Sequence, residues 1–330
     1  MKVGLYLATQ FTAEADVAVS RAEMVEQVRA ARENGFSSLW VPHHYLTAPM
    51  QMLQPMPMLA YLLPEANGMT VGPNVLVMPL LNPVQVAEEA VTLDLLSEGR
   101  FVLGIGLGYR EAEFNAFNVP LKERVQRFTE SVELMRRLWT EDRVTYKGRI
   151  FSVDDLGIGL APRRTGGPPI WVAATVDAAI RRAAKIGDAW LITNFTPLSS
   201  LAPQMQLYRD ARREAGKPEP EAFPITRECY IGTSRKGAME ECRGPLQYKY
   251  RAYSSWGLDR QSAGSESFDQ PFEELVRDRF IIGDKAFVRD ELQRYAEILG
   301  VDHFIMRVQW PGLPHEKVLR TITTLGEIFG

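Results

Sequence analysis

Short apolar runs alternate with longer amphipathic segments along the whole chain. Eight of these runs are rich in apolar and β-branched residues and have the length of strands; they lie at residues 2–9, 37–41, 69–78, 101–109, 168–174, 188–192, 225–232 and 303–308. Apolar residues at helical spacing predict helices at residues 20–34, 83–96, 121–140, 177–186, 201–215, 284–299 and 314–329. Strands that alternate with helices pair in parallel through right-handed crossovers. Eight such units predict an α/β fold closed as a (β/α)₈ (TIM) barrel, and an open doubly wound sheet is the alternative.

Two segments interrupt this alternation, and we interpret them as insertions after the fourth and the seventh strand. The first, at about residues 143–165, contains a β-hairpin at residues 144–151 with its turn at Lys147 and Gly148. The second, at about residues 236–278, is partly helical and then rich in glycine and serine at residues 262–267, which predicts a mobile stretch. With these insertions, residues 1–330 are expected to form a single domain.

Composition and charge exclude several classes of protein. Nearly half of the 330 residues are apolar, which is enough for a large core. The formal net charge of −3 shows no basic excess, so neither a nucleic acid nor an anionic membrane is expected as a partner. Cys229 and Cys242 make no disulfide framework, and no apolar run approaches the roughly 20 residues that span a bilayer. Because a strand begins at residue 2, there is no room for a signal peptide, and we expect a soluble cytoplasmic protein.

Residues that could bind a ligand or take part in catalysis directly follow the predicted strands, as expected for a barrel whose active site lies at the carboxyl ends of its strands. Histidines follow the second strand, and glycines at alternate positions (104, 106 and 108) end the fourth. Such glycines let the backbone adopt positive φ or lie close to a planar ligand. They do not match the dinucleotide-binding pattern Gly-x-Gly-x-x-Gly, because Tyr109 stands where the third glycine would be. A glycine-rich turn without a ligand is the simpler alternative.

The sequence resembles the bacterial luciferase-like family of flavin-dependent oxidoreductases. The matching stretches are WVPHHY at 40–45, VMPLLNP at 77–83, SEGRFVLGIGLGY at 97–109, EFNAF at 113–117, ERVQRF at 123–128 and AAKIGDAW at 183–190. They lie in the family's order over nearly the full length of the chain. The family fold is a (β/α)₈ barrel, which agrees with the count of strands.

This resemblance implies a site for reduced FMN. The cofactor-binding candidates are Met78, Gly106, Leu107, Gly108, Arg124, Arg127, Ala174, Thr175, Val176 and Ala179. A phosphate suits the start of a helix, and Thr175 is a candidate N-cap there. Arg124 and Arg127 could bind the same phosphate, or could simply lie on a solvated helix face. The chain departs from luciferases at Leu107, where they carry an arginine, and Asp177 would repel a phosphate unless it points away.

His43, His44 and Tyr109 are the catalytic candidates. Imidazole titrates near neutral pH, so a histidine beside the flavin could transfer a proton or donate a hydrogen bond. In the family one histidine here contributes to catalysis, and either His43 or His44 can be aligned with it. Tyr109 would be a hydrogen-bond donor or a packing wall beside the flavin.

A Met-rich segment suggests the kind of substrate. Methionines lie at positions 50, 52, 56 and 58, and with Leu53, Tyr61 and Trp310 they could form a deformable apolar pocket mouth or fill the core. We assign Met52, Met56 and Trp310 to a substrate pocket and expect an apolar substrate.

The sequence therefore predicts a flavin-dependent monooxygenase in which reduced FMN reacts with O₂ to oxygenate a small apolar molecule. A separate NAD(P)H:flavin reductase would supply the reduced FMN, because no dinucleotide-binding segment is visible. The first alternative is a hydride-transfer oxidoreductase that uses F420, and the second is a flavin-binding protein without turnover. We assign no metal ligands, and by analogy with the family we expect a homodimer.

Overall fold

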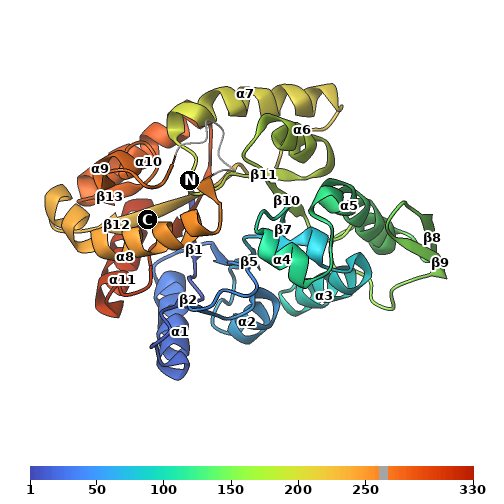
Figure 1. Cartoon of the computed structure of the whole chain (residues 1–330), viewed down its shortest axis with the longest axis horizontal. Coiled ribbons are helices and arrows are strands. Elements are labelled where there is room, and N and C mark those ends of the chain that lie inside the picture. Colours follow the sequence, from blue (N-terminus) through green and yellow to red (C-terminus); the bar gives the residue numbers. More distant parts are fainter. Residues whose placement is uncertain (260–266) are drawn as a thin grey trace.

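The computed structural model of the chain describes residues 1–259 and 267–330, and its centre is a ring of parallel strands (Figure 1). Neighbours in the ring follow one another in the order β1 (Lys2–Tyr6), β3 (Ser38–Val41), β5 (Thr70–Pro73), β7 (Leu103–Gly106), β10 (Ile170–Ala173), β11 (Ala189–Leu191), β12 (Pro224–Ile231) and β14 (His303–Arg307). Pairing of β14 with β1 closes the ring, and single bridges from Val71 to Phe101 and from Ile192 to Ile225 join its two sheets. The predicted (β/α)₈ barrel is confirmed.

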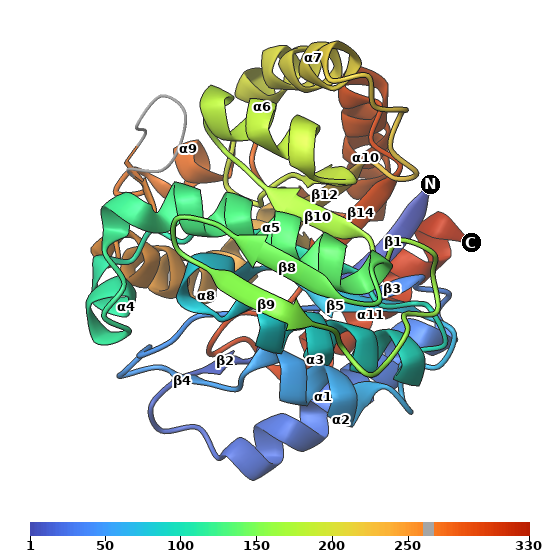
Figure 2. The same cartoon turned by 90° about the vertical axis from the view of Figure 1, so that its right-hand side faces the viewer.

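Helices cover the outside of the ring at the positions that the apolar spacing predicts (Figures 1 and 2). They are α1 (Val17–Glu33), α3 (Pro83–Leu96), α5 (Arg124–Thr140), α6 (Asp177–Ile186), α7 (Leu198–Glu214), α10 (Lys285–Leu299) and α11 (His315–Phe329). Local chemistry sets several of their ends. The Asn82 side chain accepts a hydrogen bond from the backbone N–H of Val84 at the start of α3, and Asp284 does the same for Phe287 in α10. Helix α10 ends at Gly300, whose φ of 69° is left-handed.

Several short elements were not predicted individually. The third predicted strand is divided: β5 pairs with β3, whereas β6 (Leu76–Val77) pairs with β7 and leads into a 3₁₀ turn, η1 (Met78–Leu80). The Met-rich segment is not a plain loop, because β4 (Gln51–Met52) pairs with β2 (Gln10–Phe11) and α2 (Pro55–Leu62) follows. A short helix, α4 (Glu111–Ala116), follows β7, and a 3₁₀ turn, η2 (Leu121–Glu123), leads into α5.

The segment between β12 and α10 contains a long helix, α8 (Arg235–Ser255), then α9 (Phe272–Val276) and β13 (Ile281–Gly283). Strand β13 pairs with the far end of β12, outside the ring. The stretch predicted to be mobile, 262–267, lies outside the described residues except for its last position. Among the helices described, none is long and apolar enough to cross a membrane.

A pair of stacked indoles fills the interior of the barrel. The rings of Trp40 and Trp171 lie 4.8 Å apart at an interplanar angle of 20°. The Trp40 indole N–H donates to the Ser38 hydroxyl, which also contacts His303 Nε2 at 2.7 Å. Burial lowers the pKa of His303 to about 4, so this imidazole is neutral. The barrel is therefore a packed core at this level.

The predicted hairpin is present and is held to α5 by one carboxylate. It consists of β8 (Val144–Lys147) and β9 (Ser152–Leu156), which pair antiparallel. Glu130 on α5 accepts hydrogen bonds from three consecutive backbone N–H groups in the turn, at positions 149, 150 and 151. Burial raises the pKa of Glu130, but these bonds and one from Gln126 outweigh it and hold the pKa below its ordinary value.

We predict that Glu130→Gln lowers the free energy of unfolding by about 2 kcal/mol, because the turn N–H groups lose a charged acceptor. The carboxylate stabilises the fold above its unfolded pKa, and this contribution is lost as the pH falls through the lower folded pKa. Urea unfolding of both proteins between pH 3 and 8 measures the difference. Exposed Glu133 on the same helix is the control, and a Glu133→Gln effect as large as that of Glu130→Gln would contradict this account.

Candidate active site

A cavity of about 220 Å³ opens among the carboxyl ends of the barrel strands. Its wall includes residues at or directly after the ends of their strands: Tyr6 (β1), Pro42 (β3), Asn74 (β5), Gly106 (β7), Ala173 (β10), Thr193 (β11) and Arg307 (β14). Most of the predicted residues also line it: His43, His44, Gly106, Leu107, Gly108, Tyr109, Arg124, Ala174, Thr175, Val176 and Ala179. The fold thus brings together side chains that are more than 250 residues apart in the chain.

The two adjacent histidines have different surroundings. His43 is 4% exposed, and its Nδ1 accepts a hydrogen bond of 3.0 Å from the backbone N–H of Val77. Burial, together with the nearby His44, lowers the pKa of His43 to about 3. The ring is therefore neutral and carries its proton on Nε2. His43 can donate one hydrogen bond, but it is a poor carrier of protons at neutral pH.

His44 is instead paired with a buried carboxylate. Its Nδ1 lies 3.1 Å from Glu113 Oε1, which also accepts a 2.8 Å bond from the backbone N–H of Tyr45. Glu113 is fully buried; burial raises its pKa, but its bonds to His44 and Tyr45 and the charge of Arg110 outweigh this and keep the pKa low. An ionised Glu113 fixes a proton on His44 Nδ1, which leaves Nε2 to exchange protons with a bound molecule.

Arg110 holds this pair in place. Its guanidinium donates to the carbonyls of Tyr45 and Leu46 and lies 3.4 Å from Glu113 Oε1. It also stacks over the indole of Trp256, with 4.1 Å from Cζ to the ring centroid. The Trp256 ring in turn contacts His44, with 5.5 Å between centroids. Glu113 and Arg110 were not among the predicted site residues, although both lie in the segment that follows the glycine-bearing strand.

The start of α6 forms a second part of the wall. The N-cap of this helix is Val176, not Thr175 as predicted, because the extended backbone continues one residue further. Val176 provides no side-chain acceptor for the N–H groups of the first turn, and Asp177 is exposed and lies outside the wall. Ala174 and Thr175 line the cavity, and their carbonyls accept bonds from Trp190 and Gln204. A helix start in this arrangement suits an anion.

Of the two predicted arginines, only Arg124 faces the cavity. It donates to the Gly108 carbonyl at 3.2 Å. Arg127 turns away, contacting Glu123 at 3.2 Å and lying over the Phe151 ring. Arg182, on α6, stands close enough to Arg124 that burial and the charge of Arg124 together lower its pKa. Arg124 lines the cavity and Arg182 lies behind it on the second turn of α6, so two cations stand on this side of the cavity, which favours a multiply charged anion.

Four other predicted residues do not line the cavity. Met78 is fully buried in η1. Met52 is held in the β2–β4 pair, and Met56 packs against the core from α2. Trp310 is 1% exposed, and its indole N–H donates to the carboxylate of Glu228. Met52, Met56 and Trp310 therefore do not line this cavity, and their assignment to a substrate pocket stays a prediction.

Further residues of the wall were not predicted. They are Tyr6, Pro42, Asn74, Val75, Val77, Ala173, Thr193, Asn194, Phe195, Thr226, Tyr253, Leu258 and Arg307. A sequence signal exists for Arg307, since a charged residue ends an otherwise apolar strand. Tyr253 and Leu258 come from α8 and the segment after it, and nothing in their local sequence indicates a cavity.

The sequence profile of the luciferase-like monooxygenase family matches residues 1–303. The chain belongs to this family. It is 26% identical over 275 residues to the 4-hydroxyprotoasukamycin monooxygenase of Streptomyces nodosus subsp. asukaensis, covering 81% of this chain and 74% of that protein. It is 27% identical over 322 residues to the F420-dependent glucose-6-phosphate dehydrogenase of Nakamurella multipartita, covering 90% and 89%.

A solved structure shows the same fold. The monooxygenase RslO1 from Streptomyces bottropensis matches with a TM-score of 0.86 at 24% identity, covering 99% of this chain and 98% of that one. The luciferase-like relatives thus include monooxygenases and F420-dependent dehydrogenases. The family membership confirms the resemblance that the sequence motifs indicate.

We predict that the His43 imidazole stays neutral between pH 8 and pH 5, because burial lowers its pKa to about 3. ¹⁵N NMR of the histidine rings would show an unprotonated Nδ1 and a protonated Nε2 throughout this range. A His43→Asn variant assigns the signals. A titration of His43 with a midpoint above pH 5 would contradict the assignment.

Proposed function

We propose that this protein is a flavin-dependent monooxygenase that uses reduced FMN and O₂ to oxygenate a small organic molecule, with the reduced FMN supplied by a separate NAD(P)H:flavin reductase. The observation that supports FMN best is Arg124, the first residue of α5, which lines the cavity beside the start of α6, with Arg182 of the second turn of α6 near it but outside the cavity wall. The terminal phosphate of FMN is a monoester with two negative charges, whereas the phosphate of F420 lies within its side chain as a singly charged diester. Two cations and a helix start suit the dianion better.

The rest of the cavity fits a planar ring. Gly106 and Gly108 lie in its wall, and Gly108 has a φ of 72°, which favours glycine. A Cβ at Gly108 would collide with the side chain of Val77. Val75, Val77 and Leu107 supply apolar surface along the same wall. These residues would hold the ring, and Arg124 with the first turn of α6 would hold its phosphate.

When bound, reduced FMN supplies the two electrons with which O₂ is activated. The chain itself supplies the proton transfer. One oxygen atom enters the product and the other leaves as water, which needs protons, and His44 Nε2 is the group that is free to deliver them. Glu113 accepts from His44 Nδ1 and fixes the orientation of the ring, and neutral His43 donates a hydrogen bond from Nε2. Tyr109, Phe195 and Leu258 enclose the cavity and exclude water.

An F420-dependent hydride transfer is the second candidate, and the relative from Nakamurella multipartita supports it, because it matches over 90% of this chain. In that reaction His44 would take the proton of a substrate hydroxyl as the hydride leaves its carbon. Titration of the purified protein with reduced FMN and with F420, followed by fluorescence, separates the two candidates. Tighter binding of F420 than of reduced FMN would overturn the monooxygenase proposal.

We predict that Arg124→Met and Arg182→Met each weaken FMN binding by at least about tenfold, because a charge-assisted bond to the phosphate is lost. Riboflavin has the same ring without the phosphate, so its affinity should change little. Arg127→Met is the matched control on the same helix as Arg124, and it should leave FMN binding unchanged. Equal losses for FMN and riboflavin would show that the arginines do not bind the phosphate.

We predict that His44→Asn and Glu113→Gln lower turnover by about 100-fold while FMN still binds, since proton transfer by a positioned side chain contributes factors of this size. Oxygenated product and O₂ consumption, measured with reduced FMN and a panel of substrates, give the rate. A flavin-binding protein without turnover would form no product in the wild type. Unchanged turnover in both variants would contradict the role of His44.

A further inference from the structure

The cavity has a second positively charged end. Arg307, the last residue of β14, lines it and is 1% exposed. Strand β14 adjoins β1 in the ring, whereas the segment with Arg124 and the start of α6 lie beside β7 and β10. In an eight-membered ring these positions are about four strands apart. Arg307 therefore stands across the barrel from the proposed phosphate end.

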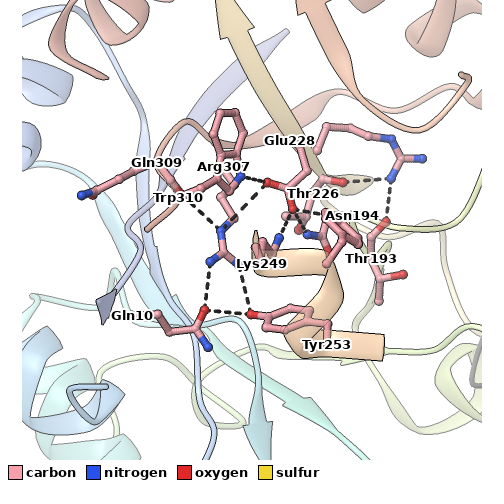
Figure 3. A network of polar contacts seen from close by, with 12 residues as sticks. Gln10, Thr193, Asn194, Thr226, Glu228, Lys249, Tyr253, Arg307, Gln309 and Trp310 are labelled. Atoms are coloured by element: carbon pink, nitrogen blue, oxygen red, sulfur yellow. Dashed lines mark hydrogen bonds and ion pairs between the residues drawn. The ribbon is translucent and has the colours of Figure 1, made fainter. Parts of the chain in front are cut away.

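Arg307 belongs to a network of buried charges (Figure 3). Its centre is the fully buried Glu228, which accepts bonds from Lys249, from the Tyr250 hydroxyl and from the indole of Trp310. Lys249 contacts Glu228 directly, while Arg307 Nε is 4.0 Å from the carboxylate. Both cations are 1% exposed. One carboxylate thus faces two cations, and Lys249 is its close partner.

The other neighbours of Arg307 are uncharged. One terminal nitrogen donates to Gln10 Oε1 at 2.9 Å, and the other donates to the Tyr253 hydroxyl at 3.3 Å. Its Cζ lies 5.0 Å from the ring centroid of Tyr6. Among the described residues, no carboxylate other than Glu228 lies close to Arg307. The Nε of Arg307 also donates to the Gln309 carbonyl at 3.5 Å, so three of the five N–H groups have partners among the described residues and the others are available to a ligand.

A hydroxyl without a partner lies on the same cavity. The Tyr109 hydroxyl is buried and makes no hydrogen bond to the residues that the structure describes. The backbone of Tyr109 follows β7, but its phenol reaches the neighbourhood of Tyr253 and Tyr6: burial raises the pKa of Tyr109, and these two phenols add to the rise. Both Tyr253 and Tyr6 lie beside Arg307. A buried hydroxyl is normally satisfied, so an unpaired one that borders a cavity is a donor for a bound molecule. A guanidinium and an unpaired phenol provide the two kinds of donor that bind an anionic oxygen.

We propose that the substrate carries one acidic oxygen, a carboxylate or a phenolate, on an apolar body, and that Arg307 and the Tyr109 hydroxyl bind this oxygen at the end of the cavity opposite the phosphate. Phe195, Leu258 and Val75 line the space between and would contact the apolar body. Gln10 and Tyr253 keep the guanidinium in place, and Lys249 neutralises Glu228 so that Arg307 stays available. This inference rests on the proposed function only in that the same cavity holds both molecules.

The test compares 1-naphthoate with its neutral isostere 1-naphthamide, titrated calorimetrically into the protein with and without FMN. We expect the wild type to bind naphthoate at least about tenfold more tightly than naphthamide, a difference of 1.4 kcal/mol. In Arg307→Met the preference should disappear, with the affinity for naphthamide little changed. Tyr109→Phe should weaken naphthoate binding several-fold. It should not lower the melting temperature, because the hydroxyl has no partner in the described chain.

Arg124→Met is the matched control, because it removes a cation from the other end of the same cavity. Its preference for naphthoate should equal that of the wild type. Loss of the preference in Arg124→Met, or an equal affinity of the wild type for the two probes, would overturn the inference. If Arg307→Met does not fold, an unchanged preference in Tyr109→Phe overturns it alone.

Binding of FMN to the same preparations separates this inference from the proposed function. Naphthoate preference without binding of FMN would refute the flavin proposal and leave the acid site standing. If the protein binds FMN but has equal affinities for naphthoate and naphthamide, the acid site is refuted and the flavin proposal stands. If Arg307→Met weakens only the binding of reduced FMN and leaves the naphthoate preference intact, the guanidinium serves the cofactor and the inference is wrong.

Discussion

Closure of the strand ring is the constraint on which the site depends. Strand β14 pairs with β1 in a register that sets Tyr6 opposite Arg307, the last residue of each strand. The same closure brings the ends of the other strands to one rim, so that side chains from the two ends of the chain share a cavity of about 220 Å³. The stacked indoles of Trp40 and Trp171 fill the interior of the ring. Because the interior is packed with side chains, this cavity lies at the rim and does not extend through the barrel.

Within the rim, burial gives similar side chains different roles. His43 and His44 are adjacent in the chain, yet one accepts a backbone N–H and is kept neutral, whereas the other is paired with the ionised Glu113. Arg124 and Arg127 are one helical turn apart, and only the first faces the cavity. In both pairs the deciding factor is which neighbour completes the hydrogen bonds of the side chain. The different roles within each pair therefore follow from the packed surroundings and not from the residue type.

The sequence predicts the barrel well because the alternation of apolar runs and amphipathic segments is a local pattern that repeats eight times. It also predicts that the histidines, Gly106 and Gly108 lie at the carboxyl ends of strands, and the structure has these residues in the cavity wall. It does not predict partners that are distant in the chain: Glu113 is 69 residues from His44, and Tyr253 is 54 from Arg307. The assignment of Trp310 to the pocket failed to match the cavity wall for the same reason. Trp310 follows a strand, but its indole is drawn inward by Glu228, which lies 82 residues away.

Helix α8, between β12 and β13, contributes several side chains to the rim of the barrel. Helix α8 provides Lys249, which neutralises Glu228, and Tyr253, which lines the cavity and accepts a bond from Arg307. Trp256, directly after α8, packs against His44 and Arg110. Burial and the charge of Arg307 lower the pKa of Lys249, and its direct contact with Glu228 opposes both effects. The cavity wall thus combines residues at the ends of the strands with Tyr253 of α8. Segments of this kind, at the carboxyl end of a barrel, can vary while the strands keep their positions, which is how one barrel supports different sites.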